Sequence, residues 1–126
     1  MTCWKISGRP WVAIKAAFAS SDGANVDRHF GRADRFVIYT LTGEGSSFEE
    51  TRELKTVSIE DQDFNLKSIA EMLSDCVIIV AQKFGRHAFP LFDPARSELL
   101  ELDGPINGML PYLEKLLRIR KKYRSS

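Results

Sequence analysis

Short apolar segments separated by polar stretches predict β-strands in the first half of the chain. Residues 12–20 (VAIKAAFAS) form one such segment, and residues 35–41 (RFVIYTL) form a second that is rich in aromatic and β-branched residues. A third strand is predicted after a turn at residues 43–47 (GEGSS), from the apolar residues Leu54, Val57 and Ile59. Because no helical pattern separates these segments, we expect them to form an antiparallel meander.

The spacing of apolar residues becomes helical after residue 60. Asp61 or Asp63 can cap a helix whose apolar positions recur every three or four residues, at Leu66, Ile69, Ala70 and Leu73. Residues 76–81 (CVIIVA) then form a run that is apolar on both faces. Such a run is typical of a strand buried in the centre of a sheet.

The last third of the chain predicts one more strand and a long helix. The strand covers residues 98–102 (ELLEL), and Pro90 and Pro94 shorten any helix before it. Asn107 is the expected N-cap of the final helix, which leaves Pro111 in its first turn. The apolar stripe of this helix consists of Ile106, Met109, Leu110, Leu113, Leu116 and Leu117. The order βββαβαβα predicts an α/β fold with a mixed five-stranded sheet and helices on its faces.

Composition indicates a globular protein of one domain. The 126 residues are 44% hydrophobic and 28% charged, which suffices for a single core. We expect residues 1–11 to be a flexible leader and residues 12–126 to form the domain. The longest apolar run is too short to span a bilayer, and the leader lacks the apolar region of a signal peptide. We therefore expect a cytoplasmic protein that does not bind a membrane.

The net charge of +1 is unevenly distributed. The end of the chain has no acidic residue after Glu114 but carries Lys115, Arg118, Arg120, Lys121, Lys122 and Arg124. A nucleic-acid-binding domain usually presents a broader basic face, so we do not expect a nucleic acid as partner. These cations are simply explained as complements to the C-terminal end of the last helix.

Groups suited to binding a ligand are concentrated in two loops, at residues 27–32 (DRHFGR) and 83–87 (KFGRH). If the strands at 12–20 and 76–81 are parallel neighbours, both loops leave the sheet at one edge, where α/β folds bind ligands. The topology therefore predicts that the two loops lie together.

The two loops carry groups that suit an anionic, metal-containing ligand. We expect Phe30 to anchor the first loop in the core and to hold the imidazole of His29 beside it. Gly31 would allow a turn with positive φ. Donors to an anion could come from Arg28, Arg32, Arg35, Lys83 and Arg86, with His87 beside them.

Each of these features also has a simpler structural explanation. A single loop histidine more often forms hydrogen bonds than binds a metal. Arginines near Asp27 and Asp34 can form surface ion pairs, each contributing roughly 0–1 kcal/mol. Cys3 and Cys76 are isolated and lack CxxC spacing, and a cysteine at a strand start is usually a buried apolar group. A free Fe²⁺ or Zn²⁺ ion would need three or four protein ligands, which the sequence does not group.

One block of the sequence resembles a known family. A first strand is followed by Ser21-Asp22-Gly23 (with Ser20 one place earlier), then by HFG at residues 29–31, then by a strand ending in Ile-Tyr. This block resembles the opening of the dinitrogenase iron-molybdenum cofactor biosynthesis family, which includes NifX, NafY and the C-terminal part of NifB. The resemblance extends over nearly the whole chain after the leader.

The resemblance implies a three-layer ribonuclease-H-like fold and a non-enzymatic carrier of iron–sulfur or iron–molybdenum clusters, bound transiently. It implies partners among the assembly or acceptor proteins of metallocluster biosynthesis related to nitrogenase. The family's proposed cluster ligand matches His29, and a cysteine found in some members matches Cys76. A preassembled cluster brings its own sulfides, so one imidazole and a cationic rim could hold it. The chain departs from the family at residues 83–92, where relatives often have small residues.

Two other functions remain open. Nucleases share this general fold, but two-metal hydrolysis needs clustered carboxylates. Asp22 ends the first strand and Glu71 lies on the first helix, whereas the strand at 76–81 is followed by Gln82. An interaction module without a cluster, docking its basic C-terminal helix on an acidic protein, is the second alternative.

Overall fold

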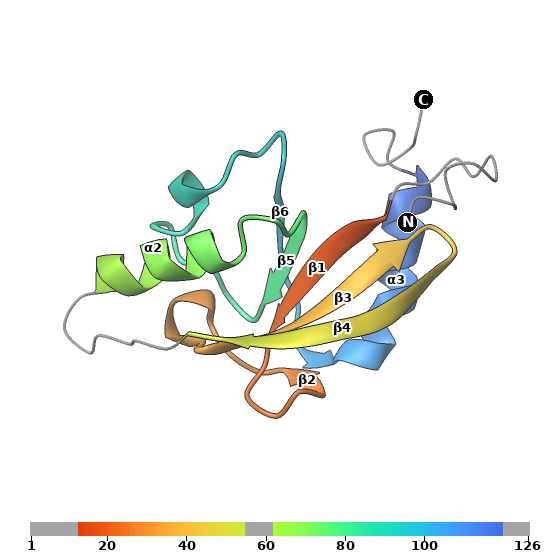
Figure 1. The fold of residues 1–126 in the computed structure, drawn as a ribbon, viewed down its shortest axis with the longest axis horizontal. Helices are drawn as coiled ribbons and strands as arrows, with labels where there is room; N and C mark the ends of the chain where they lie inside the picture. The colour runs from red at the N-terminus through yellow and green to blue at the C-terminus, as the bar shows by residue number, and fades with distance from the viewer. Residues whose placement is uncertain (1–12, 55–61, 120–126) are drawn as a thin grey trace.

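The computed structural model describes residues 13–54 and 62–119, which are built around one five-stranded sheet (Figure 1). The strand order is β4-β3-β1-β5-β6. These strands are β1 (Ile14–Ala19), β3 (Arg35–Thr42), β4 (Gly45–Glu53), β5 (Ile78–Ala81) and β6 (Glu98–Glu101). The other elements are the two-stranded pair β2 (Asn25–Val26) and β7 (Gly104–Pro105), α2 (Gln62–Met72), α3 (Ile106–Ile119), and the 3₁₀ turns Phe30–Arg32 and Phe89–Leu91. The predicted leader lies outside the described residues.

Strand β1 lies at the centre of the sheet and makes it a mixed one. It pairs antiparallel with β3 and parallel with β5, so that Ala16 is opposite Tyr39 on one side and Ile78 on the other. β4 continues the antiparallel half, and β6 continues the parallel half. The predicted mixed sheet of five strands, and the predicted parallel pairing of β1 with β5, are therefore confirmed.

A helix covers each face of the sheet (Figure 1). Successive side chains of a strand point to opposite faces. β1 accordingly contributes Ala16 and Phe18 to the core beneath α3, and Ala17 and Ala19 to the core beneath α2. The predicted apolar stripe of α3 is confirmed, because all six of its residues are buried. None of the helices in the described ranges is long and apolar enough to cross a membrane.

The third strand differs from the prediction in its position. β4 spans Gly45–Glu53 and follows a two-residue turn, so the turn predicted at 43–47 is shorter and the strand begins earlier. Leu54 directly follows the strand, and residues 55–61 lie outside the described residues. β4 is an edge strand, and five consecutive residues of it are exposed. An edge strand facing solvent has no need of alternating apolar residues, which is why the sequence pattern did not reveal it.

The predicted order of helices is also not confirmed. Only the 3₁₀ turn Phe89–Leu91, which contains Pro90, lies between β5 and β6, where the prediction places a helix. The final helix begins at Ile106, so Asn107 is not its N-cap, and Pro111 lies beyond its first turn. The amide of Ile106 instead donates to the carbonyl oxygen of Ala24 (2.9 Å), which ties the start of α3 to the first loop.

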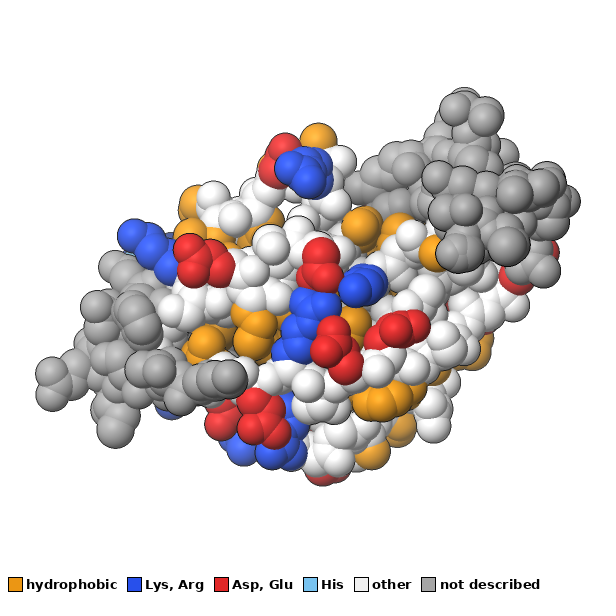
Figure 2. All heavy atoms as spheres, viewed as in Figure 1, with side chains coloured by type: hydrophobic (Ala, Val, Ile, Leu, Met, Phe, Trp, Pro, Cys, Tyr) orange, Lys and Arg blue, Asp and Glu red, His pale blue; other side chains and the backbone are white. Residues whose placement is uncertain are grey.

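Acidic and basic side chains gather in the middle of the face shown in Figure 2. Ion pairs join Arg52 of β4 to Glu50 and Asp75, and Lys15 of β1 to Asp75. These side chains connect strands to the end of α2, away from the two loops predicted to bind a ligand.

Candidate functional site

Two backbone hydrogen bonds hold the predicted ligand loops side by side. The amide of Phe30 donates to the carbonyl oxygen of Lys83 (2.8 Å), and the amide of Gln82 donates to that of Arg28 (2.9 Å). The loops follow the C-terminal ends of the parallel strands β1 and β5, as the topology predicted. Their adjacency is therefore confirmed.

Phe30 anchors the first loop in the core. Its side chain is fully buried, with its ring centroid 5.2 Å from that of Phe84, 5.8 Å from Phe92 and 6.0 Å from Phe36. Burying one such ring contributes about 1.5–3 kcal/mol, and favourable ring pairs add about 0.5–1.5 kcal/mol each. The preceding residue, His29, is held in place through this anchor.

The imidazole of His29 is exposed and available to a ligand. The residue has extended backbone (φ −72°, ψ 146°) at the start of the 3₁₀ turn, and its carbonyl oxygen accepts the amide of Arg32 (3.0 Å). Its ring has no hydrogen-bond or ion-pair partner within residues 13–54 and 62–119. The simpler explanation, a histidine that forms hydrogen bonds within the protein, therefore does not apply within the described part of the chain.

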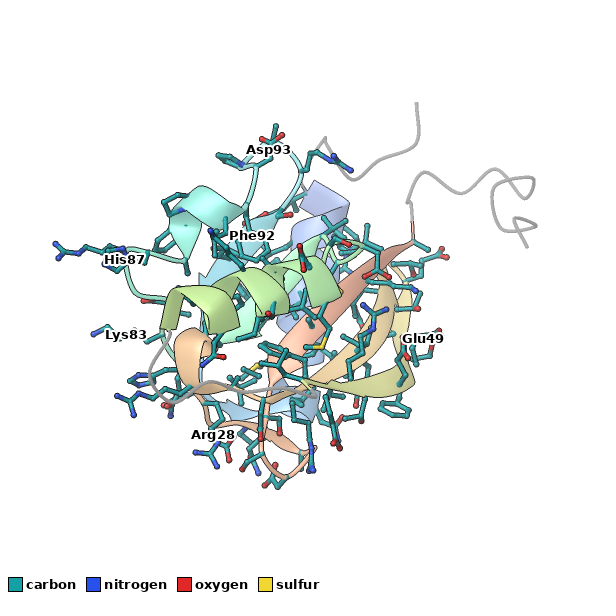
Figure 3. The ribbon with its side chains drawn as sticks, turned by 60° about the vertical axis from the view of Figure 1, so that its left-hand side comes forward. Arg28, Glu49, Lys83, His87, Phe92 and Asp93 are labelled. Carbon is teal, nitrogen blue, oxygen red and sulfur yellow. The ribbon has the colours of Figure 1, made fainter. Side chains whose placement is uncertain are left out.

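A shallow hollow of about 410 Å³ adjoins His29. It is lined by Asp27, Arg28, His29, Arg32 and Gln82. Arg28 and Arg32 are exposed, and neither forms an ion pair with the described residues. Lys83 and His87 of the second loop lie on the same side of the molecule, where Figure 3 shows them extending outward above Arg28. Of the predicted residues, the hollow brings together His29, Arg28 and Arg32.

The Ser-Asp-Gly block forms a turn that shapes the first loop. One carboxylate oxygen of Asp22 accepts the amides of Ala24 and Asn25 (both 2.9 Å) and the hydroxyl of Ser20 (3.1 Å). The backbone bond from Ala24, followed by bonds from Asn25, holds the pKa of Asp22 well below its ordinary value. Gly23 has φ of +82°, a conformation that other residues resist.

Arg35 and Asp27 also stabilise this loop. Arg35 donates to the carbonyl oxygen of Ser21 (3.0 Å) and pairs with Glu53 (3.3 Å). The carboxylate of Asp27 accepts the amide (2.9 Å) and the hydroxyl (2.5 Å) of Ser21. Arg35 thus holds the loop to the end of β4, and it does not line the hollow.

Comparison with known proteins identifies the family. Residues 12–109 match the family model described as dinitrogenase iron-molybdenum cofactor. The chain belongs to this family. The family suggested by the sequence resemblance is thereby confirmed.

Similarity to individual members is moderate. The chain is 32% identical to protein NifX of Azotobacter vinelandii over 75 residues, which cover 60% of this chain and 48% of the relative. It is 29% identical to protein NifX of Klebsiella pneumoniae over 104 residues, which cover 81% of this chain and 66% of the relative. The chain thus spans less than two thirds of the length of the curated relatives it matches. The crystal structure of PH0822 shares the fold, with a TM-score of 0.63 at 24% identity, covering 80% of this chain and 88% of that one.

Within this iron-molybdenum cofactor family domain, Cys76 lies far from His29. Cys76 precedes β5, whereas the loop of His29 bonds to Gln82, just beyond the other end of β5. Six extended residues span on the order of 20 Å, so the two side chains cannot bind the same ion. Burial raises the pKa of the Cys76 thiol to about 12, with a further contribution from the charge of Asp75. The structure therefore does not bring together the two residues predicted as metal ligands.

A second hollow, of about 560 Å³, adjoins Cys76 at this opposite edge of the family domain. Its lining includes Asp75, Asp93 and Arg96, and Figure 3 places Asp93 well away from Lys83 and Arg28. It is larger than the hollow beside His29 but contains none of the basic residues predicted for the site.

The prediction for Gly31 is wrong in its physical reason. Gly31 lies inside the 3₁₀ turn and does not have positive φ; the described glycines that do are Gly23, Gly85 and Gly104. Gln82 lines the hollow but was not among the predicted site residues. Its position directly after the predicted buried strand was the signal that could have identified it.

No group of three or more His, Cys, Asp or Glu side chains is arranged to hold a metal ion within residues 13–54 and 62–119. The carboxylate of Asp22 is occupied by loop donors, and Glu71 is an exposed residue of α2. At the hollow, an isolated cation would find one imidazole and one carboxylate, that of Asp27. A polynuclear cluster, whose metals are already bridged by sulfide, places fewer demands on the protein.

Proposed function

We propose that this chain is a non-enzymatic carrier that holds an iron–sulfur or iron–molybdenum cluster, or its precursor, at the hollow beside His29. The observation that carries the proposal is the exposed imidazole of His29, which has no partner in the described chain and lines the same hollow as Arg28 and Arg32, within the residues that match the family model. The carrier releases its cluster to an assembly or acceptor protein in the cytoplasm.

The chemistry of the hollow fits a cluster with net negative charge. A neutral imidazole nitrogen supplies one bond to iron or molybdenum, replacing a weakly held outer ligand. The guanidinium groups of Arg28 and Arg32 attract an anion and can donate to its sulfides. Lys83 and Arg86 add positive charge from the second loop. One coordinate bond with electrostatic support gives binding that is easily reversed, as a carrier requires.

The family supports this proposal. Among the proteins that match is one named FeMo cofactor biosynthesis protein NifB, from Chlorobaculum tepidum, of which this chain covers 22% of the length. We infer that this chain acts in the same kind of process, in the context of nitrogen fixation. We also infer that its sheet and helices follow the ribonuclease-H-like topology.

The two histidines of the chain allow a matched test. Both His29 and His87 are exposed loop residues, but only His29 lines the hollow. Protein reconstituted without oxygen from iron and sulfide, or supplied with an extracted iron–molybdenum cluster, is passed over a desalting column. Iron, molybdenum and sulfide per chain are then measured. We expect His29→Ala to lose most of the metal and His87→Ala to retain it.

Equal retention by wild-type protein and His29→Ala would overturn the proposal. Loss of metal by both variants would instead show that the second loop also provides a ligand. Circular dichroism of the two variants checks that neither substitution has unfolded the chain.

A further inference from the structure

Phe89 is a large apolar side chain held in an exposed position beside the candidate site. Its side chain is 51% exposed, although its ring centroid lies 6.1 Å from that of the buried Phe84. Phe84 in turn contacts Phe30, the anchor of the first loop, at 5.2 Å. A line of three aromatic rings therefore runs from the surface to the residue that follows His29.

The backbone around Phe89 is held by hydrogen bonds. The amide of Ala88 donates to the carbonyl oxygen of Gly85 (3.1 Å), and the amide of Phe92 donates to that of Phe89 (3.2 Å). Pro90 fixes one backbone dihedral angle of the same turn. The exposed ring is thus preorganised, and a partner that contacts it need not order a flexible segment.

The loop that leads to Phe89 is basic. Lys83 and Arg86 are exposed, and neither has an ion-pair partner within the described ranges. The sequence contains no acidic residue from Gln82 to Phe92, and Asp93, which follows, lines the hollow beside Cys76 and lies well away from Lys83 (Figure 3). Glu101 comes near this loop, but its carboxylate accepts the amide of Phe84 (3.0 Å) and so helps to fix the loop.

We propose that Phe89, Lys83 and Arg86 form a docking surface for a protein partner that has an apolar pocket bordered by acidic side chains. A preorganised aromatic ring with neighbouring cations has the features of an interface anchor: the ring fills a pocket, and the charges orient the partner and speed its approach. The loop of this docking surface bonds directly to the loop of His29. That the docked protein delivers or receives a cluster rests on the proposed function, but docking itself does not.

Charge and geometry argue against other occupants. A second copy of the chain, bound through the same surface, would bring cations against cations. Single-stranded nucleic acid is usually bound by several stacking aromatic residues in a basic groove. The other large apolar residues that are well exposed in the described chain, Phe48, Tyr112 and Ile119, lie on β4 and α3. They are not part of the loop of Phe89, which therefore does not present the several exposed rings that such binding uses.

Peptide selection on the cluster-free protein tests the docking surface directly. A displayed library of random twelve-residue peptides is selected on the wild-type chain, and the selected peptides are measured against variants. We expect them to combine acidic residues with a large apolar residue, and we expect Phe89→Ala or Lys83→Glu/Arg86→Glu to weaken binding at least tenfold. Phe48→Ala is the matched control, because Phe48 is 57% exposed on the edge strand β4, and it should leave binding unchanged.

Several outcomes would overturn the proposal. The first is a selection that yields no peptide whose binding depends on Phe89. The second is an equal loss of peptide binding in Phe89→Ala and Phe48→Ala. The third is binding of fluorescent oligo(dT) that depends on Phe89. Reconstitution separates this result from the proposed function: Phe89→Ala should retain iron as the wild-type chain does. Loss of peptide binding with retained iron in Phe89→Ala assigns docking alone to Phe89.

Discussion

Arg52 on β4 and Asp75 before β5 form a two-bond ion pair, with 2.7 Å between Nη1 and Oδ1 and 2.9 Å between Nη2 and Oδ2. Arg52 also donates to the carbonyl oxygen of Met72 at the end of α2 (2.9 Å). β4 and β5 are separated in the sheet by β3 and β1. The pair therefore ties the edge strand to the connection between α2 and β5.

This pair predicts a loss of stability in acid. The hydrogen bonds from Arg52, with a smaller contribution from Lys15, hold the pKa of Asp75 below its ordinary value of 3.8. Its stabilising effect is complete above the unfolded-state pKa and is lost as the pH falls through the lower native pKa. We expect Asp75→Asn to lower the free energy of unfolding by about 1 kcal/mol at pH 7 and by less near pH 2, where part of this stabilisation has already been lost.

Urea unfolding at the two pH values measures this difference. Lys15→Ala is the control, because Lys15 makes a single contact with Asp75 at 3.3 Å and is 41% exposed. Its effect should stay within about 0.5 kcal/mol at both pH values. A loss for Asp75→Asn that is the same near pH 2 as at pH 7 would show that the charge of Asp75 is not what stabilises this connection.

Arg28 and Arg32 are expected to attract the negatively charged cluster electrostatically. Replacing both with alanine should weaken cluster retention at least tenfold, because each charge-assisted contact contributes on the order of 1 kcal/mol at an exposed site. Retention by the wild-type chain should fall as salt is raised from 0.05 to 0.5 M, and retention by the double variant should change less. Iron per chain after desalting at each salt concentration is the measurement.

Arg96 offers the matched control for these arginines. It is exposed, but it lines the hollow beside Cys76 at the opposite edge of the sheet. Arg96→Ala should therefore retain iron as the wild-type chain does. If Arg96→Ala and the double variant lose iron equally, binding depends on overall charge and not on the hollow beside His29.

Cys76 is expected to be an unreactive structural residue. Because burial raises the pKa of its thiol to about 12, almost no thiolate is present at pH 8. In a Cys3→Ser background, iodoacetamide should leave Cys76 unmodified in the folded protein and modify it in urea. Mass spectrometry measures the modification.

The same residue tests the geometry of the cluster site. Since Cys76 lies at the far end of β5 from the His29 loop, Cys76→Ala should retain iron. Thermal unfolding followed by circular dichroism would confirm that the variant is folded. A loss of iron as large as that of His29→Ala would contradict the placement of the cluster at the hollow beside His29.

The parts of the fold that were predicted correctly are those whose side chains are buried. α3 carries apolar residues with the helical period, and β1, β3 and β5 carry runs of apolar residues, because each packs against the core on at least one face. β4 was misplaced because its sequence, GSSFEETRE, lies at an edge and faces solvent at most positions. The turn Phe89–Leu91 replaced a predicted helix because Pro90 occupies its centre.

Two features of the candidate site were predicted from the sequence: the adjacency of its two loops, which follows from topology, and the anchoring of the first loop, which follows from packing. The rule that parallel neighbours present their loops at one edge brought DRHFGR and KFGRH together, and Phe30 proved to be the anchor. The role of Arg35 could not be read from sequence, because its partners Ser21 and Glu53 are set by the hairpin register. The separation of Cys76 from His29 likewise depends on the direction of β5.

The hydrogen bonds that join the two loops have a consequence for biosynthesis. During translation, His29 leaves the ribosome before Lys83 does. The carbonyl oxygen of Lys83, which accepts the amide of Phe30 in the folded chain, is therefore not available at first. The hollow is complete only after β5 has been made and has aligned with β1. A nascent chain therefore does not form the complete hollow early, and truncated products of interrupted translation that end before β5 contain His29 without Gln82, which also lines the hollow.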